Sequence, residues 1–297
     1  LAPALPRWPA WVQLRQRVET TRATVPCHVS PVRLITDLSS LGSTDGVTDG
    51  VTESVIKLTR APQSLSEWHR LFRLERPVVF GAQCALLGHA ATRRWSDWDY
   101  LRDCLGRRTL PVELGSRYTD AEWRQTLMLG DDFLQHITLD KEPKAYLAQH
   151  ALFEQVASLK RDFAVPEVCL AAPGPAVAVN AWLGPRNTVS PVHYDARQNL
   201  LTQVIGSKYL RLLPPEMSRF LSHGDNTSRV DVFAPSEQRR LKCLDVLLQP
   251  GESVYLPPLW WHHVQSLSLS FSVSCWFGRA ACERRMHAHL TDREVAS

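Results

Sequence analysis

The spacing of apolar residues changes along the chain, from a helical period near its start to strand-like alternation in its second half. Apolar side chains recur at helical spacing over residues 65–72 and 95–105, which predicts two helices. Residues 76–80 and 109–114 read as strands. A capping arrangement over 119–124, with a helical pattern that continues to residue 136, predicts a further helix.

Short alternating strands dominate after Pro185. A small helical front end that leads into many short strands predicts a mainly β fold, a double-stranded β-helix or jelly-roll barrel. With 297 residues, 44% of them hydrophobic, the chain can bury one large core. We therefore expect one principal domain over residues 59–278 rather than two equal domains.

The two ends of the chain differ from this principal domain. Residues 1–58 read as an N-terminal extension, in which apolar residues between Trp8 and Val18 predict one short amphipathic helix. Within the extension, residues 37–53 are rich in Ser, Thr, Gly and Asp, which is typical of a flexible linker. Residues 279–297 read as a basic tail. Because the chain lacks an initiator methionine, we expect it to be a fragment of a longer protein.

A lysine stands within the most regular alternation, over residues 199–213. Gly206-Ser207 reads as a two-residue hairpin turn, across which Ile205 would face Lys208. Alternation then places one mostly apolar set toward the interior: Asn199, Leu201, Gln203, Ile205, Lys208, Leu210 and Leu212. A lysine directed inward requires an anion to meet it. Alternatively, Lys208 reaches past the turn into solvent, and this segment alone supports both interpretations.

His193 and Asp195 lie two residues apart on an extended segment, so their side chains point to the same face of a sheet. Far downstream, a Pro-Pro-Leu-Trp-Trp run ends in His262 and His263, which on a strand face opposite ways. Two histidines and one carboxylate on one face of a metal form the site of non-haem Fe(II) oxygenases, which leaves positions open for a cosubstrate and O2. A His-x-Asp pair also arises by chance in many proteins, so this motif alone does not establish a metal site.

Four further strings of sequence are long enough to be specific: PVELGSRYTD (111–120), YLAQH (146–150), NAWLGP (180–185) and LSFSVSCW (269–276). With them, the segment from Ala61 to Gly278 resembles JmjC-domain 2-oxoglutarate oxygenases, in the branch that contains arginyl hydroxylases and a lysine demethylase. The resemblance implies a cupin-like JmjC barrel over residues 59–278. It also implies Fe(II) as cofactor, with 2-oxoglutarate and O2 as cosubstrates.

The resemblance assigns the metal to His193, Asp195 and His262, because in the family the last ligand follows the aromatic residues of the proline-containing run. His263 is then expected to point away from the metal or to contact one of the metal ligands without binding the metal itself. On the same grounds these three ligands are the catalytic residues.

The resemblance also places the cosubstrate. Tyr146 and Lys208 would hold the distal carboxylate of 2-oxoglutarate, with Ser190 and Asn199 nearby. Trp276 would wall this pocket, although core packing is an ordinary alternative for such a large side chain.

For the substrate, the resemblance implicates Glu113, Trp123, Gln149 and Trp182. A guanidinium suits a carboxylate fork and an aromatic face, which favours arginine. The ordinary alternatives are a charge at a strand edge for Glu113 and a helix-packing residue for Trp123.

The reaction that follows is hydroxylation of an arginine C–H bond in a protein substrate, coupled to conversion of 2-oxoglutarate and O2 into succinate and CO2. On the same scaffold, oxidation of an N-methyl carbon would instead make the chain a histone N-methyl-lysine demethylase. Two other classes stay open: a catalytically silent cupin-like binding module, and a zinc- or manganese-dependent cupin such as an isomerase.

Composition adds little to partner choice. A net charge of +4 fits an acidic or chromatin-associated partner but argues for none, and the basic run at residues 239–242 leaves nucleic-acid binding open. Seven cysteines without a Cys-x-x-Cys pair favour reduced thiols in a nuclear or cytoplasmic setting. No run of about 18 apolar residues occurs, so no membrane span is expected.

Overall fold

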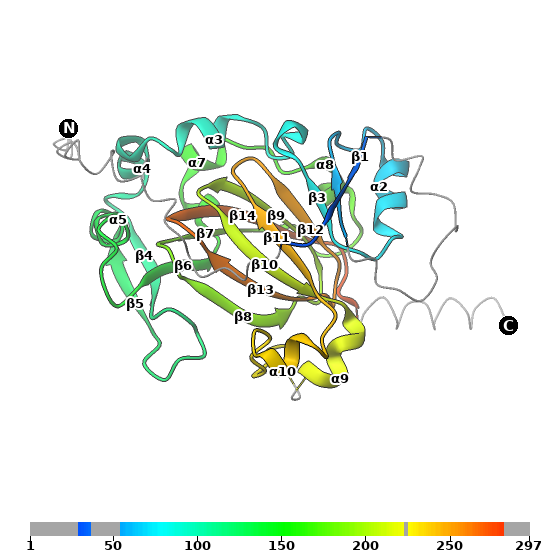
Figure 1. Ribbon diagram of the computed structural model, residues 1–297. Coiled ribbons are helices and arrows are strands. Elements are labelled where there is room, and N and C mark those ends of the chain that lie inside the picture. Colours follow the sequence, from blue (N-terminus) through cyan, green and yellow to red (C-terminus); the bar gives the residue numbers. More distant parts are fainter. Residues whose placement is uncertain (1–28, 37–53, 223–224, 282–297) are drawn as a thin grey trace, which may run out of the picture.

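The computed structural model describes residues 29–36, 54–222 and 225–281, and two β-sheets dominate it (Figure 1). The ten-stranded sheet has the order β1 (Val32–Ile35), β2 (Val55–Leu58), β3 (Val78–Phe80), β12 (Ser253–Leu256), β9 (Gln198–Ile205), β14 (Ser270–Phe277), β7 (Ala178–Gly184), β6 (Ala145–His150), β4 (Thr109–Leu114) and β5 (Arg124–Leu129). The four-stranded sheet has the order β11 (Leu244–Leu248), β10 (Lys208–Leu213), β13 (Trp261–Ser266) and β8 (Val189–Tyr194). This mainly antiparallel pair of sheets confirms the predicted jelly-roll barrel.

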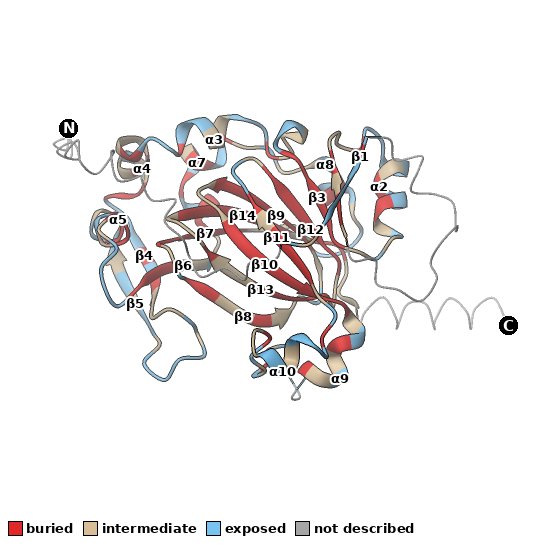
Figure 2. Ribbon diagram, in the orientation of Figure 1, coloured by how far each residue is buried: buried red, intermediate tan, exposed pale blue. Residues whose placement is uncertain are grey.

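One hydrophobic cluster fills the space between the two sheets. The large sheet contributes Leu201 and Leu256 to it, and the small sheet contributes Leu210 and Val246. Figure 2 shows most strands of both sheets as buried. Burial of this apolar surface holds the sheets face to face.

Short helices pack on the outer surfaces of the barrel (Figure 1). They are α2 (Leu65–Phe72), α3 (Ala90–Arg94), α4 (Trp98–Leu105), α5 (Gly130–Thr138), α6 (Leu152–Gln155), α7 (Ala157–Lys160), α8 (Glu167–Ala171), α9 (Ser218–Leu221) and α10 (Pro235–Gln238), with 3-10 turns η2 (Ala82–Cys84) and η3 (Pro215–Met217). Helices α2 and α4, and strands β3 and β4, confirm the elements predicted for the front end. Helix α2 begins where the Ser64 hydroxyl accepts a hydrogen bond from the Glu67 amide, 3.2 Å away.

The predicted hairpin at Gly206-Ser207 is wrong, although Leu201, Leu210 and Leu212 lie between the sheets as predicted. Ile205, predicted on the same face, instead packs in the cluster that contains Val204. Strand β9 bonds to β12 and β14, whereas β10 bonds to β11 and β13, so the turn crosses from one sheet to the other. Gly206 has a φ of +68°, and a Cβ there would lie 2.0 Å from the Leu269 carbonyl oxygen. Lys208 nevertheless faces the interior and is only 2% exposed.

The helix predicted from residue 119 is also wrong in its first half. Residues 119–123 form turns, Arg124–Leu129 is strand β5, and helix α5 begins only at Gly130. Strand β5 pairs along its length with β4, from Thr109 opposite Leu129 to Leu114 opposite Arg124. This long-range pairing overrides the local capping signal.

Part of the segment assigned to the N-terminal extension belongs to the large sheet. Strands β1 and β2 pair in parallel with each other, and β2 pairs in parallel with β3. Val55, Ile56 and Leu58 are buried. The helix expected near Trp8, the linker at 37–53 and the tail after residue 281 lie outside the described residues.

Cys84, Cys104, Cys169, Cys243 and Cys275, the cysteines in the described part of the chain, are all free thiols. Among the described residues there is no helix with the length and apolar character that crossing a membrane requires.

Candidate metal centre and its cavity

Strand register brings the distant histidines together. In the small sheet, His193 of β8 lies directly opposite His262 of β13. Asp195 follows β8, and its carbonyl oxygen accepts a hydrogen bond from the Leu259 amide at 2.9 Å, which ties the two motifs together. One ligand atom from each of His193, Asp195 and His262 lies within 4.8 Å of the others.

Backbone carbonyls orient both imidazoles. His193 Nδ1 lies 2.7 Å from the Pro191 carbonyl oxygen, and His262 Nδ1 lies 2.9 Å from that of Trp260. A carbonyl oxygen only accepts, so each Nδ1 donates its proton and each Nε2 keeps a free lone pair. Burial and the neighbouring His262 lower the pKa of His193 to about 4, which keeps this imidazole neutral.

The carboxylate is held in the same manner. Asn199 Nδ2 donates to Asp195 Oδ2 at 3.0 Å, and the same oxygen lies 3.8 Å from His262 Nε2. Two imidazoles and one carboxylate on one side of a site, with the other side open to a cavity, form a donor set that fits Fe(II).

His263 lies on the opposite face of β13. It is buried, and its ring meets Phe233 edge-on with centroids 4.9 Å apart. Burial is the largest cause that lowers its pKa to about 3. The structure thus separates the two adjacent histidines as strand alternation predicted.

A small cavity of about 30 Å³ is lined by the candidate ligands His193, Asp195 and His262. It is lined by every residue expected to bind the cosubstrate: Tyr146, Ser190, Asn199, Lys208 and Trp276. Asn199 Oδ1 and Trp276 Nε1 are buried and have no hydrogen-bond partner among the described residues. These orphaned polar atoms indicate a cavity shaped for a polar ligand.

Lys208 is the lysine that lines this cavity. Its Nζ lies 3.3 Å from the Tyr146 hydroxyl, and no carboxylate in the described ranges forms an ion pair with it. Burial lowers the pKa of Lys208 to about 7. A buried ammonium without a counter-charge is costly, so the site favours an anion.

A second cavity of about 440 Å³ adjoins the first and shares Tyr146, Trp182 and Trp276 with it. Glu113 and Gln149, both expected to bind substrate, also line it. Trp123 is not among the lining residues, but its indole Nε1 donates to Glu113 Oε2 at 3.3 Å. Burial raises the pKa of Glu113.

Sequence reasoning missed several residues of this larger cavity. Tyr118 stands within a string that carried the family resemblance, but no role was assigned to it. Asn226 and Thr227 come from a segment without apolar periodicity, so no sequence signal pointed to them. The Tyr118 hydroxyl lies 3.5 Å from the Thr227 hydroxyl and spans the cavity wall.

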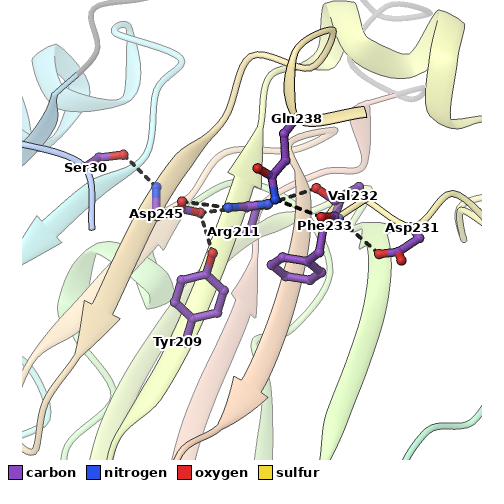
Figure 3. A network of polar contacts seen from close by, with 8 residues as sticks. All are labelled: Ser30, Tyr209, Arg211, Asp231, Val232, Phe233, Gln238 and Asp245. Carbon is purple, nitrogen blue, oxygen red and sulfur yellow. Dashed lines mark hydrogen bonds and ion pairs between the residues drawn. The ribbon is translucent and has the colours of Figure 1, made fainter. Parts of the chain in front are cut away.

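A buried polar network supports this wall from the outer face of the small sheet (Figure 3). Both carboxylate oxygens of Asp245 accept from Arg211, at 2.8 and 2.9 Å, and one also accepts from the Tyr209 hydroxyl at 2.6 Å. Arg211 Nη1 donates to the Val232 carbonyl oxygen at 2.8 Å, and its guanidinium lies over the Phe233 ring. The network thereby fastens the segment that begins with the cavity residues at 226–227.

The chain matches a known protein family and several known proteins. The Cupin-like domain family matches residues 64–281. The chain is similar to Lysine-specific demethylase 8 of Xenopus tropicalis (42% identity, 68% of this chain and 48% of the relative). It is also similar to Jumonji C domain-containing protein 5 of Drosophila melanogaster (43%, 63% and 51%) and Lysine-specific demethylase JMJ30 of Arabidopsis thaliana (39%, 64% and 48%). The chain therefore spans about half the length of these curated relatives. On its fold, its His-Asp-His group and these similarities, the chain belongs to the cupin-like JmjC family.

Proposed function

We propose that this protein is an Fe(II)- and 2-oxoglutarate-dependent dioxygenase that hydroxylates arginine residues in protein substrates. Fe(II) and 2-oxoglutarate are the cofactor and cosubstrate of JmjC enzymes. The observation that carries the oxygenase proposal is the buried Lys208, which has no counter-charge among the described residues and lines the same cavity as the His193, Asp195 and His262 group. Neither a silent binding module nor a three-ligand isomerase site requires that cation.

Each side chain then has a defined task. His193, Asp195 and His262 would hold Fe(II), which with bound 2-oxoglutarate supplies the oxidation of a C–H bond coupled to formation of succinate and CO2. Lys208 and the Tyr146 hydroxyl would bind the distal carboxylate. No side chain is needed as nucleophile, because the protein supplies position, charge and exclusion of water.

Glu113 supports arginine as the substrate residue. Its carboxylate lines the larger cavity and is oriented by the Trp123 indole. Burial raises the pKa of Glu113 because it disfavours the ionised carboxylate. A cation that enters the cavity would offset that cost. A guanidinium pairs with a carboxylate through two parallel N–H donors, which an ammonium lacks.

Mass spectrometry of arginine-containing peptides after incubation with Fe(II), 2-oxoglutarate and O2 tests the proposal. We expect a gain of one oxygen on arginine that depends on His193. Replacing arginine by lysine in the peptide should remove most of the product. Absence of succinate release with iron present would favour the silent binding module.

A second function has specific support. Two relatives are named lysine-specific demethylases, and aromatic side chains of Tyr118, Trp182 and Trp276 line the cavity, a composition that suits a methylated ammonium. Such an enzyme would release formaldehyde from methyl-lysine peptides and leave arginine unmodified. Formaldehyde release that depends on His193, without oxygen gain on any arginine, would replace the hydroxylase proposal.

Protein or peptide partners, including chromatin-associated ones, are part of the same proposal. The basic run gives less support to nucleic acid, because Arg240 stacks on Phe220 and lies 3.5 Å from Glu237. Arg239 and Lys242 remain exposed.

A further inference from the structure

Strand β5 ends the large sheet and exposes leucines to solvent. Leu127 is 71% exposed and Leu129 is 52% exposed. In the described part of the chain, no strand pairs with the outer edge of β5. Figure 2 shows β5 at the left margin of the molecule with exposed and half-buried positions alternating along it.

These leucines share one face of the β4–β5 ribbon with Glu113. The register places Gln125 opposite Glu113, Leu127 opposite Pro111, and Leu129 opposite Thr109. Alternation turns Thr126 and Met128 inward, where Met128 packs against the core. The outward face therefore carries an apolar strip of Pro111, Leu127 and Leu129 that ends at the polar pair of Glu113 and Gln125, with Thr109 at its other end.

Glu113 makes this strip continuous with the catalytic cavity, because the same carboxylate lines the larger cavity. When a bound polypeptide places a cationic side chain at Glu113, the residues next to that side chain lie at the end of the strip. The open edge of β5 also offers backbone donors and acceptors to an extended chain.

We propose that the outer face of β4–β5 binds the apolar flank of the substrate polypeptide, in an extended conformation, while its cationic residue enters the cavity at Glu113. This inference rests on the proposed function and adds a requirement on the substrate. Strand rise is about 3.4 Å per residue, so Leu127 and Leu129 lie about 7 and 14 Å along the ribbon from Gln125. The substrate should carry apolar side chains about two to four residues from the modified one.

Fluorescently labelled peptides of about twelve residues, long enough to span the strip and the cavity entrance, test this surface. Their binding to the full chain is measured with Mn(II) and 2-oxoglutarate, so that no turnover occurs. Each peptide has one arginine in a glycine–serine background. Two of them carry leucines at the second and fourth positions, on either the amino or the carboxyl side, and a third carries serines there. Burial of one or two leucines is expected to tighten binding about tenfold for one of the two leucine peptides.

The decisive variant is Leu127→Ser/Leu129→Ser. Leu129 is the N-cap residue of α5, where serine is a favoured residue, so the variant should fold. Its matched control is Leu34→Ser, which removes a leucine of 64% exposure from β1, the strand at the opposite end of the same sheet. We expect the leucine preference to disappear in the double variant and to persist in the control, with 2-oxoglutarate binding unchanged in both.

Equal binding of the leucine and serine peptides by the wild-type protein, or no binding of either, would overturn the proposal. So would a leucine preference that persists in the double variant. If light scattering showed that the double variant converts a dimer into a monomer, the strip would be a self-interface instead. Peptides in which trimethyl-lysine replaces arginine test the arginine proposal separately from the proposed peptide-binding face. Unchanged affinity with an intact leucine preference would contradict arginine as the substrate residue and would still support binding at β4–β5.

Discussion

His262 and His263 are neighbours in β13 with opposite tasks. We expect His262→Ala to lose iron and to abolish succinate formation, because His262 faces Asp195 and the cavity. His263→Ala should keep most of its activity and lose about 1–3 kcal/mol of unfolding free energy, because its ring packs against Phe233. Metal analysis and succinate release measure the first effect, and denaturant unfolding the second. The reverse pattern would move the ligand by one residue.

Lys208→Ala removes the charge that would meet the distal carboxylate of 2-oxoglutarate. Loss of a charge-assisted hydrogen bond costs about 1.5–3 kcal/mol, so affinity for 2-oxoglutarate should fall about tenfold to a hundredfold. Iron binding should stay almost unchanged, because Lys208 is not a ligand. An unchanged half-saturation concentration for 2-oxoglutarate would assign the carboxylate to another partner.

Lys208 also predicts how cosubstrate binding depends on pH. Burial lowers its pKa to about 7, and a bound carboxylate would raise that pKa. Affinity for 2-oxoglutarate should therefore be highest below pH 7 and should fall as the pH rises above it, because binding then requires proton uptake. The other titratable groups that line this cavity are Tyr146, His193, Asp195 and His262.

Calorimetry near pH 8, in two buffers that differ in ionisation enthalpy, measures this proton uptake. Lys208→Arg keeps a cation that stays protonated, so its binding should take up no proton. Equal uptake in the wild type and in Lys208→Arg would assign the proton to one of the other groups.

At the scale of single residues, sequence reasoning worked where a motif carried the chemistry. The spacing of His193 and Asp195 made them candidates, which the family resemblance then selected. Strand alternation placed Lys208 on the inward face but left a path into solvent open. Thr227 was not a candidate, because it reaches the cavity through a bridge to His193 that no local pattern encodes.

At the scale of elements, β10 and β11 are joined by the buried Arg211–Asp245 pair described above. Asp245→Asn should destabilise the protein by about 3–5 kcal/mol, because it leaves the buried guanidinium without its counter-charge. Replacing both partners by apolar residues, as in Arg211→Met/Asp245→Leu, should recover most of that loss. Urea unfolding of the three proteins measures the effect, and a double variant as unstable as Asp245→Asn would contradict it.

Element types were easier to predict than their partners. The alternation around Gly206 gave the inward positions of Leu201, Leu210 and Leu212 correctly, since alternation depends only on the strand itself, but it failed for Ile205 at the turn. Whether β9 pairs with β10 depends on β12, β13 and β14, which lie far away in sequence. Strand β5 is an exception among the element types, because pairing with the preceding strand β4 converts an apparent helix start into a strand.

At the scale of the whole molecule, the pairing of β1 and β2 with β3 indicates how far the chain can be shortened before it loses stability. A protein that begins at residue 59 would lose β2 and uncover the edge of β3, together with the apolar surface that Val55, Ile56 and Leu58 bury. We expect it to unfold at a lower temperature than a protein that begins at residue 29. Equal melting temperatures would show that the two strands add nothing to the barrel.

The buried cation at Lys208 has a consequence for the folding equilibrium itself. Lys208 is buried without a counter-charge among the described residues, so a bound 2-oxoglutarate carboxylate would complete the electrostatics of the interior. A ligand that binds only the native state stabilises it by about 2.7 kcal/mol at a hundred times its dissociation constant. The folded fraction of this protein, and with it its resistance to proteolysis, should thus rise and fall with the supply of 2-oxoglutarate.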